Sequence, residues 1–100
     1  MNIIIPVSHN NKEEATITLL EDVKHWAYVE MGEGEMTKCD FHDKRDDIKD
    51  WVECVVVKND KEYVWPFMEE NIMVLIAPEQ NTIEEIVSAY MFRELHDLNV

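Results

Sequence analysis

VECVVV at residues 52–57 and IMVLIA at residues 72–77 are the two apolar runs that decide the fold. Neither run alternates with polar residues, which is the pattern of strands buried on both faces in a parallel sheet. The charged and aromatic segment 59–71 between them is long enough for a crossover helix. Because parallel strands joined in this way need a right-handed crossover, this part of the chain is predicted to form a βαβ unit.

A further helix is predicted at residues 82–91, after Pro78 has ended the second strand. Thr82 and Glu85 have the spacing of a capping box, in which each side chain accepts the other residue's backbone N–H. The helix would carry apolar residues at helical spacing, namely Ile83, Ile86, Val87, Tyr90 and Met91. If this final helix continues beyond about Met91, His96 would lie in its last turn, where the helix dipole favours a cation.

The first half of the chain is predicted to supply the other strands. Residues 2–7 are too continuously apolar to be half exposed, so we expect this strand to be central. Residues 15–20 read as a short strand or the start of a turn. Residues 25–31 alternate as a strand does, and residues 35–41 return from a hairpin that holds both glycines, Gly32 and Gly34. A positive φ is expected at one of these glycines, and the charges of the returning strand suit a sheet edge.

Two segments between these elements have less distinct patterns. Residues 42–50 are highly charged and are expected to form a short helix, with an apolar stripe of Ile48, Trp51 and Val52. In the crossover segment, Pro66 either kinks a helix that begins near Asp60 or lies in the first helical turn. The aromatic residues of this segment are expected to cover the sheet, namely Tyr63, Trp65 and Phe67.

Together these elements predict one α/β domain at residues 1–100. The expected architecture is a ribonuclease H-like three-layer fold. It has a five-stranded mixed sheet of order 3-2-1-4-5, with helices packed on it.

The chain is strongly acidic, with 22 acidic and 9 basic residues and a formal net charge of −13. A nucleic acid would be repelled and is not expected as a partner. The acidity serves solubility, or attraction to a basic protein or to cations. No apolar run approaches the roughly 20 residues of a membrane span. The apolar residues 1–6 are too short for a signal peptide and lack a basic region before them, so export is not expected. We therefore expect a cytoplasmic protein without membrane attachment, as a monomer or a weak homodimer.

The sequence resembles a known family in four stretches, which read MNIIIPV at 1–7, WAYVEMGEGEMTK at 26–38, CVVV at 54–57 and TIEEIVSAYMFREL at 82–95. It is similar to the dinitrogenase iron–molybdenum cofactor biosynthesis family, of the NifX and NifB C-terminal type. The resemblance implies a small accessory or carrier domain that is not an enzyme. It also implies a metal-cluster assembly protein as partner. The cofactor is left open by the sequence, with iron, zinc or an iron–sulfur or iron–molybdenum cluster as the alternatives.

Three family elements are replaced in this chain. TLLEDVKH at residues 18–25 lacks the family's Phe-Gly, while FHDKR at 41–45 and KNDK at 58–61 stand where the family has glycine-rich loops. Each lost glycine lets fewer backbone N–H groups approach an anion. A cation is therefore favoured over an anionic cluster. The alternative is an acidic interaction or regulatory module that kept the fold and lost the ligand site.

Candidate metal ligands are predicted at one end of the sheet. His9 follows the central strand, His25 begins its antiparallel neighbour and His42 ends the returning strand. Cys39, in a Cys-x-x-His spacing with His42, is a possible soft fourth ligand, because imidazole and thiolate suit iron and zinc. Neighbouring carboxylates could orient the imidazoles, namely Asp40 and Asp43. The competing interpretation is that these are unrelated loop residues.

No catalytic motif is present, whether a nucleophile elbow, a Walker loop or a dinucleotide fingerprint. A ribonuclease H-like nuclease would need carboxylates on its central strands to hold two metal ions, and residues 2–7 have none. The two cysteines, Cys39 and Cys54, are expected to be free thiols, with Cys54 buried in a strand. We expect a protein that is not an enzyme.

Overall fold

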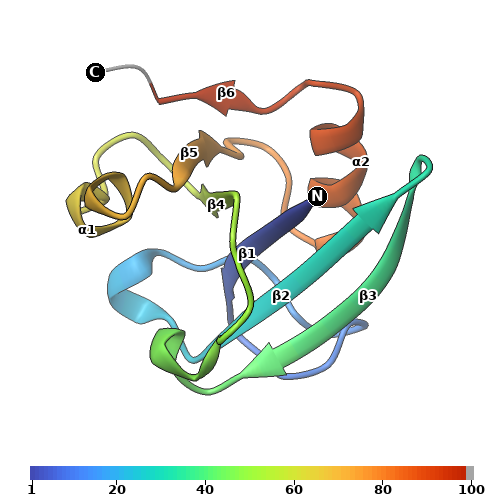
Figure 1. Cartoon of the computed structure of the whole chain (residues 1–100), viewed down its shortest axis with the longest axis horizontal. Helices are drawn as coiled ribbons and strands as arrows, with labels where there is room; N and C mark the ends of the chain where they lie inside the picture. Colours follow the sequence, from blue (N-terminus) through green and yellow to red (C-terminus); the bar gives the residue numbers. More distant parts are fainter. Residues whose placement is uncertain (99–100) are drawn as a thin grey trace.

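The computed structural model describes residues 1–98 and contains one six-stranded mixed sheet with two α-helices (Figure 1). The strands are β1 Asn2–Val7, β2 His25–Gly32, β3 Glu35–His42, β4 Cys54–Val57, β5 Met73–Ile76 and β6 His96–Asp97. The helices are α1 Trp65–Glu69 and α2 Ile83–Met91, with single 3-10 turns at η1 Leu20–Asp22 and η2 Arg45–Asp47. The strand order is β3-β2-β1-β4-β5-β6.

The mixed sheet confirms the predicted positions of β1 and β3. β1 lies inside the sheet, antiparallel to β2 and parallel to β4, and Ile3, Ile4 and Ile5 are fully buried. β3 forms one edge, where Lys38 and Asp40 are exposed. Charged side chains on an edge strand oppose pairing with another chain.

The predicted number of strands was wrong, because a short sixth strand, β6, pairs antiparallel with β5. α2 ends at Met91, and Arg93 takes a positive φ of 58° that turns the chain back towards the sheet. His96 therefore lies in β6, where it pairs with Ile76 of β5. It is not in the last turn of a helix, so its interpretation as a helix-dipole partner was wrong. The ribonuclease H-like classification stays a prediction.

The crossover helix α1 is shorter than predicted and has Pro66 in its first turn, which was one of the two expected placements. A proline is tolerated there because the N–H it lacks would have no partner within the helix. Phe67 is buried, but Tyr63 is 74% exposed and Trp65 is 58% exposed. The expectation that all three aromatic residues cover the sheet was therefore wrong for two of them.

The other loosely predicted segments contain no α-helix. The charged segment before β4 holds only the 3-10 turn η2, and its apolar stripe consists of Ile48 and Val52, since Trp51 is 71% exposed. The segment after β1 makes an isolated bridge from Ile17 to Val7 and does not form a strand of the sheet.

Apolar clusters cover both faces of the sheet and give three layers. One cluster lies between the sheet and α2 and includes Ile3, Ile5, Val7, Ala27, Val29, Val56, Ile83 and Ile86. The other lies on the opposite face, under α1 and the segment before β4, and includes Ile4, Trp26, Tyr28, Val55, Val57, Phe67 and Ile72. Because successive strand residues point to opposite faces, β1 and β4 contribute to both clusters and read as unbroken apolar runs.

The predicted capping box at the start of α2 is confirmed. The backbone N–H of Glu85 donates to Thr82 Oγ1 at 3.1 Å, and the backbone N–H of Thr82 donates to Glu85 Oε1 at 3.0 Å. These backbone donors, with that of Asn81, hold the pKa of Glu85 below its usual range. The start of α2 is thus fixed by local chemistry.

The β2–β3 hairpin generates a stability prediction. Glu33 and Gly34 take φ values of 55° and 82°, as in a type I′ turn, which confirms the positive φ expected for a hairpin glycine. A Cβ on Gly34 would meet no atom within 4 Å, so Gly34→Ala should cost only backbone strain, about 1 kcal/mol in the free energy of unfolding. Urea unfolding measures this loss.

Gly32→Ala is the matched control for this experiment. Gly32 has no positive φ, and its Cβ would lie at an ordinary 3.8 Å from Thr37 Cγ2. We expect Gly32→Ala to change stability much less. Equal losses in the two variants would contradict the assignment of strain to position 34.

Candidate functional site

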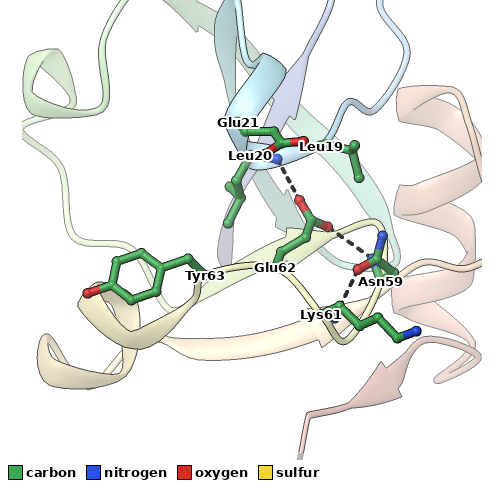
Figure 2. A pocket seen from close by; sticks show the side chains of 7 residues that line it. All are labelled: Leu19, Leu20, Glu21, Asn59, Lys61, Glu62 and Tyr63. Carbon is green, nitrogen blue, oxygen red and sulfur yellow. Dashed lines mark hydrogen bonds between the residues drawn. The ribbon is translucent and has the colours of Figure 1, made fainter.

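A crevice lies where the loops after β1 and β4 meet. β1 and β4 are parallel, so their carboxyl ends lie at the same edge of the sheet. From there the chain continues in opposite directions across the sheet, from β1 to β2 and from β4 to β5. Open α/β sheets bind ligands at such a topological switch point. A hollow of about 560 Å³ lies here, lined by Leu19, Leu20, Glu21, Asn59, Lys61, Glu62 and Tyr63 (Figure 2).

Glu62 holds the two loops of the crevice together. Its Oε2 accepts the backbone N–H groups of Lys58 at 2.8 Å and Asn59 at 3.0 Å, both just after β4. Its Oε1 accepts the backbone N–H of Leu20, in the loop after β1, at 2.5 Å. Figure 2 shows the Glu62 side chain between the two loops, and Asn59 turned back to accept the N–H of Lys61. One half-buried carboxylate thus binds three backbone donors.

Glu62 is a site residue that was not predicted from the sequence. The lost glycines of residues 58–61 were expected to weaken contact with an anion. The structure shows that two N–H groups of this loop still converge on an oxygen, and that the oxygen belongs to the chain itself. The available signal was a glutamate four residues after Lys58, close enough for its side chain to reach back to the turn.

The predicted metal ligands His9, His25 and His42 lie near one end of the sheet. Val7, the last residue of β1, pairs with His25, while Trp26 pairs with His42. Directly paired residues share a face, so His25 lies on the face of Val7 and His42 on the face of Trp26. Val7 and Trp26 belong to clusters on opposite faces. The topology therefore brings these strand ends together but separates the imidazoles of His25 and His42.

Polar side chains contact the rings of His25 and His9. His25 Nδ1 lies 3.1 Å from Asp43 Oδ1, so the expected orienting carboxylate is present for this residue. His9 Nδ1 lies 2.8 Å from Ser8 Oγ, and His9 Nε2 lies 3.9 Å from Glu14 Oε2. Within residues 1–98, no group of three or more His, Cys, Asp or Glu side chains is placed to hold a metal ion.

Cys39 lies away from the histidines along the edge strand. It pairs with Val29, four residues from His25 on β2, a separation of roughly 13 Å along the strand. The half-burial of Cys39 raises the pKa of its thiol. Since the thiolate is the metal-binding form, a metal ion at this position would have to displace the thiol proton. Burial raises the pKa of Cys54 to about 12, and both cysteines are free, as expected.

Thiol labelling tests whether burial raises the pKa values of Cys39 and Cys54 in the folded protein. At pH 8 we expect a disulfide reagent to modify Cys39 more slowly in the folded protein than in urea, because less thiolate forms. Cys54 should react only on unfolding. Cys39→Ser and Cys54→Ser identify the two signals. Labelling of Cys39 in the folded protein at the rate found in urea would contradict the assignment.

The fold places the chain in a class of small mixed α/β domains found among solved structures. PH0822 superposes with a TM-score of 0.78 over 97% of this chain and 94% of that one, at 13% identity. A "putative dinitrogenase" from Methanocaldococcus jannaschii superposes with a TM-score of 0.74 over 97% of this chain and 93% of that one, at 17% identity. A "putative NifB protein" from Thermotoga, of the DUF35 family, superposes with a TM-score of 0.70 over 99% of this chain and 94% of that one, at 12% identity.

At these identities the likeness concerns the fold. The chain matches no protein-family model and no curated protein. The neighbours include dinitrogenase and NifB names, so the resemblance seen in the sequence is confirmed at the level of the fold. No helix in the described part of the chain is both long enough and apolar enough to cross a membrane.

Proposed function

We propose that this chain is a small cytoplasmic accessory domain, not an enzyme, that serves the assembly of a metal cofactor by binding another protein of that process. The observation that carries the proposal is the likeness of fold to the proteins named for dinitrogenase and NifB. This likeness extends over nearly the whole of both chains in each comparison.

The charge of the chain favours a protein or a cation over an anionic cluster. The formal net charge is −13, and several basic side chains already lie beside acids, as in the pairs Lys12–Glu84, Lys38–Asp40 and Arg45–Glu70. The field near the surface is therefore negative and attracts basic partners, less strongly as salt is added. At the crevice, the backbone donors that would receive an anion already bind Glu62.

The competing role is that of a cluster carrier, and iron content distinguishes the two. We expect protein incubated without oxygen with ferrous ion and sulfide to leave gel filtration colourless, with far less than one iron per chain. Cys39→Ser, which lacks the more accessible thiol, sets the background. A coloured cluster retained in stoichiometric amount by the wild type, and lost in the variant, would support the carrier role instead.

A second candidate function is the binding of a divalent cation at His25. Asp43 Oδ1 lies 3.1 Å from Nδ1 of this residue, and metal-binding imidazoles have a carboxylate neighbour of this kind. The site predicted from the sequence also included His9, His42 and Cys39. The strand register does not bring His42 and Cys39 to His25, so this candidate rests on His25 with Asp43.

Zinc titration of single variants tests this candidate. We expect His25→Ala to weaken zinc binding about tenfold or more, the size of effect seen when a ligand or its supporting group is lost. His42→Ala should have little effect because His42 lies on the opposite face. His96→Ala, in β6 at the far edge of the sheet, is the control. Unchanged affinity in His25→Ala would remove the candidate.

A further inference from the structure

The contacts of Glu62 are those of a bound anion. Three backbone N–H groups, from Leu20, Lys58 and Asn59, point at its two oxygens, at distances of 2.5 to 3.0 Å. Two of these donors are consecutive in the chain, and the third comes from a residue 42 positions away from Glu62. Consecutive backbone N–H groups that converge on one point form a concave site for anions.

These donors also lie at the position in the fold where a ligand is expected. They lie outside the carboxyl ends of β1 and β4, at the switch point of the sheet, where α/β proteins bind their ligands. The hollow beside them is lined by the apolar residues Leu19 and Leu20, by Lys61 and by Tyr63, which is 74% exposed. It is large enough to receive the Glu62 side chain or the body of a small molecule.

We propose that the backbone donors of Leu20, Lys58 and Asn59 form an oxyanion site, and that Glu62 is its resident anion. In the free protein the carboxylate of Glu62 satisfies the donors and keeps other oxyanions out. When this carboxylate is removed or drawn away, a phosphate or carboxylate group of a small molecule binds in its place. This inference does not depend on the accessory role proposed above.

Removal of the Glu62 carboxylate tests the proposal directly. In ¹⁵N-labelled Glu62→Ala, inorganic phosphate should shift the amide signals of Leu20, Lys58 and Asn59 in a saturable way. The wild type should bind phosphate at least about tenfold more weakly, since its own carboxylate competes for the same donors. Sodium chloride at equal ionic strength should not reproduce the shifts, and acetate in a parallel titration shows whether a carboxylate group is also accepted.

Glu21→Ala is the matched control, since Glu21 is an exposed acid that lines the same hollow. It removes the same charge from the crevice without freeing the three donors. If Glu62→Ala does not fold, Glu62→Gln keeps the side-chain length and one acceptor oxygen. Phosphate should then shift the same amides at higher concentration.

The proposal is overturned if phosphate gives no saturable shift at these amides in either Glu62 variant. It is also overturned if Glu21→Ala or sodium chloride produces the same response, because the effect would then be one of charge alone. A response confined to the Glu62 variants and to the three named amides supports it.

Discussion

The parallel contact between β1 and β4 is the constraint on which the rest of the structure depends. Ile3 pairs with Cys54 and Ile4 with Val55, and both strands are buried on both sides. Each face must therefore be covered, by α2 on one side and by α1 with the segment before β4 on the other. The same pairing places two strand ends together with their loops running in opposite directions. The core and the crevice thus have one origin.

Glu62 connects this architecture to the proposed oxyanion site. The loops after β1 and β4 approach each other because their strands are neighbours, and their backbone N–H groups then need acceptors. In this chain the acceptor is a carboxylate of the second loop, which supplies a negative charge without a ligand. The acidic surface and this internal anion both oppose the entry of an anionic cluster. They support the proposal of an accessory domain that works through a partner protein.

The histidines show how topology and side-chain direction can disagree. The order of the strands brings the end of β1, the start of β2 and the end of β3 to one end of the sheet, as the sequence predicted. The alternation of side chains along each strand then decides which face each residue reaches. His25 and His42 reach opposite faces of the sheet. Asp43 contacts His25. A shared end of the sheet is therefore not sufficient for a shared site.

The sequence by itself determined the features that depend on neighbouring residues. Unbroken apolar runs marked β1 and β4, glycine marked the hairpin turn, and the spacing of Thr82 and Glu85 marked the start of α2. Only the tertiary structure decided the sixth strand, the faces of the histidines and the contacts of Glu62. These depend on pairs far apart in the chain, such as Leu75 with Asp97 and Leu20 with Glu62. Local pattern carries no information about such pairs, because their energies arise only when the sheet brings the partners together.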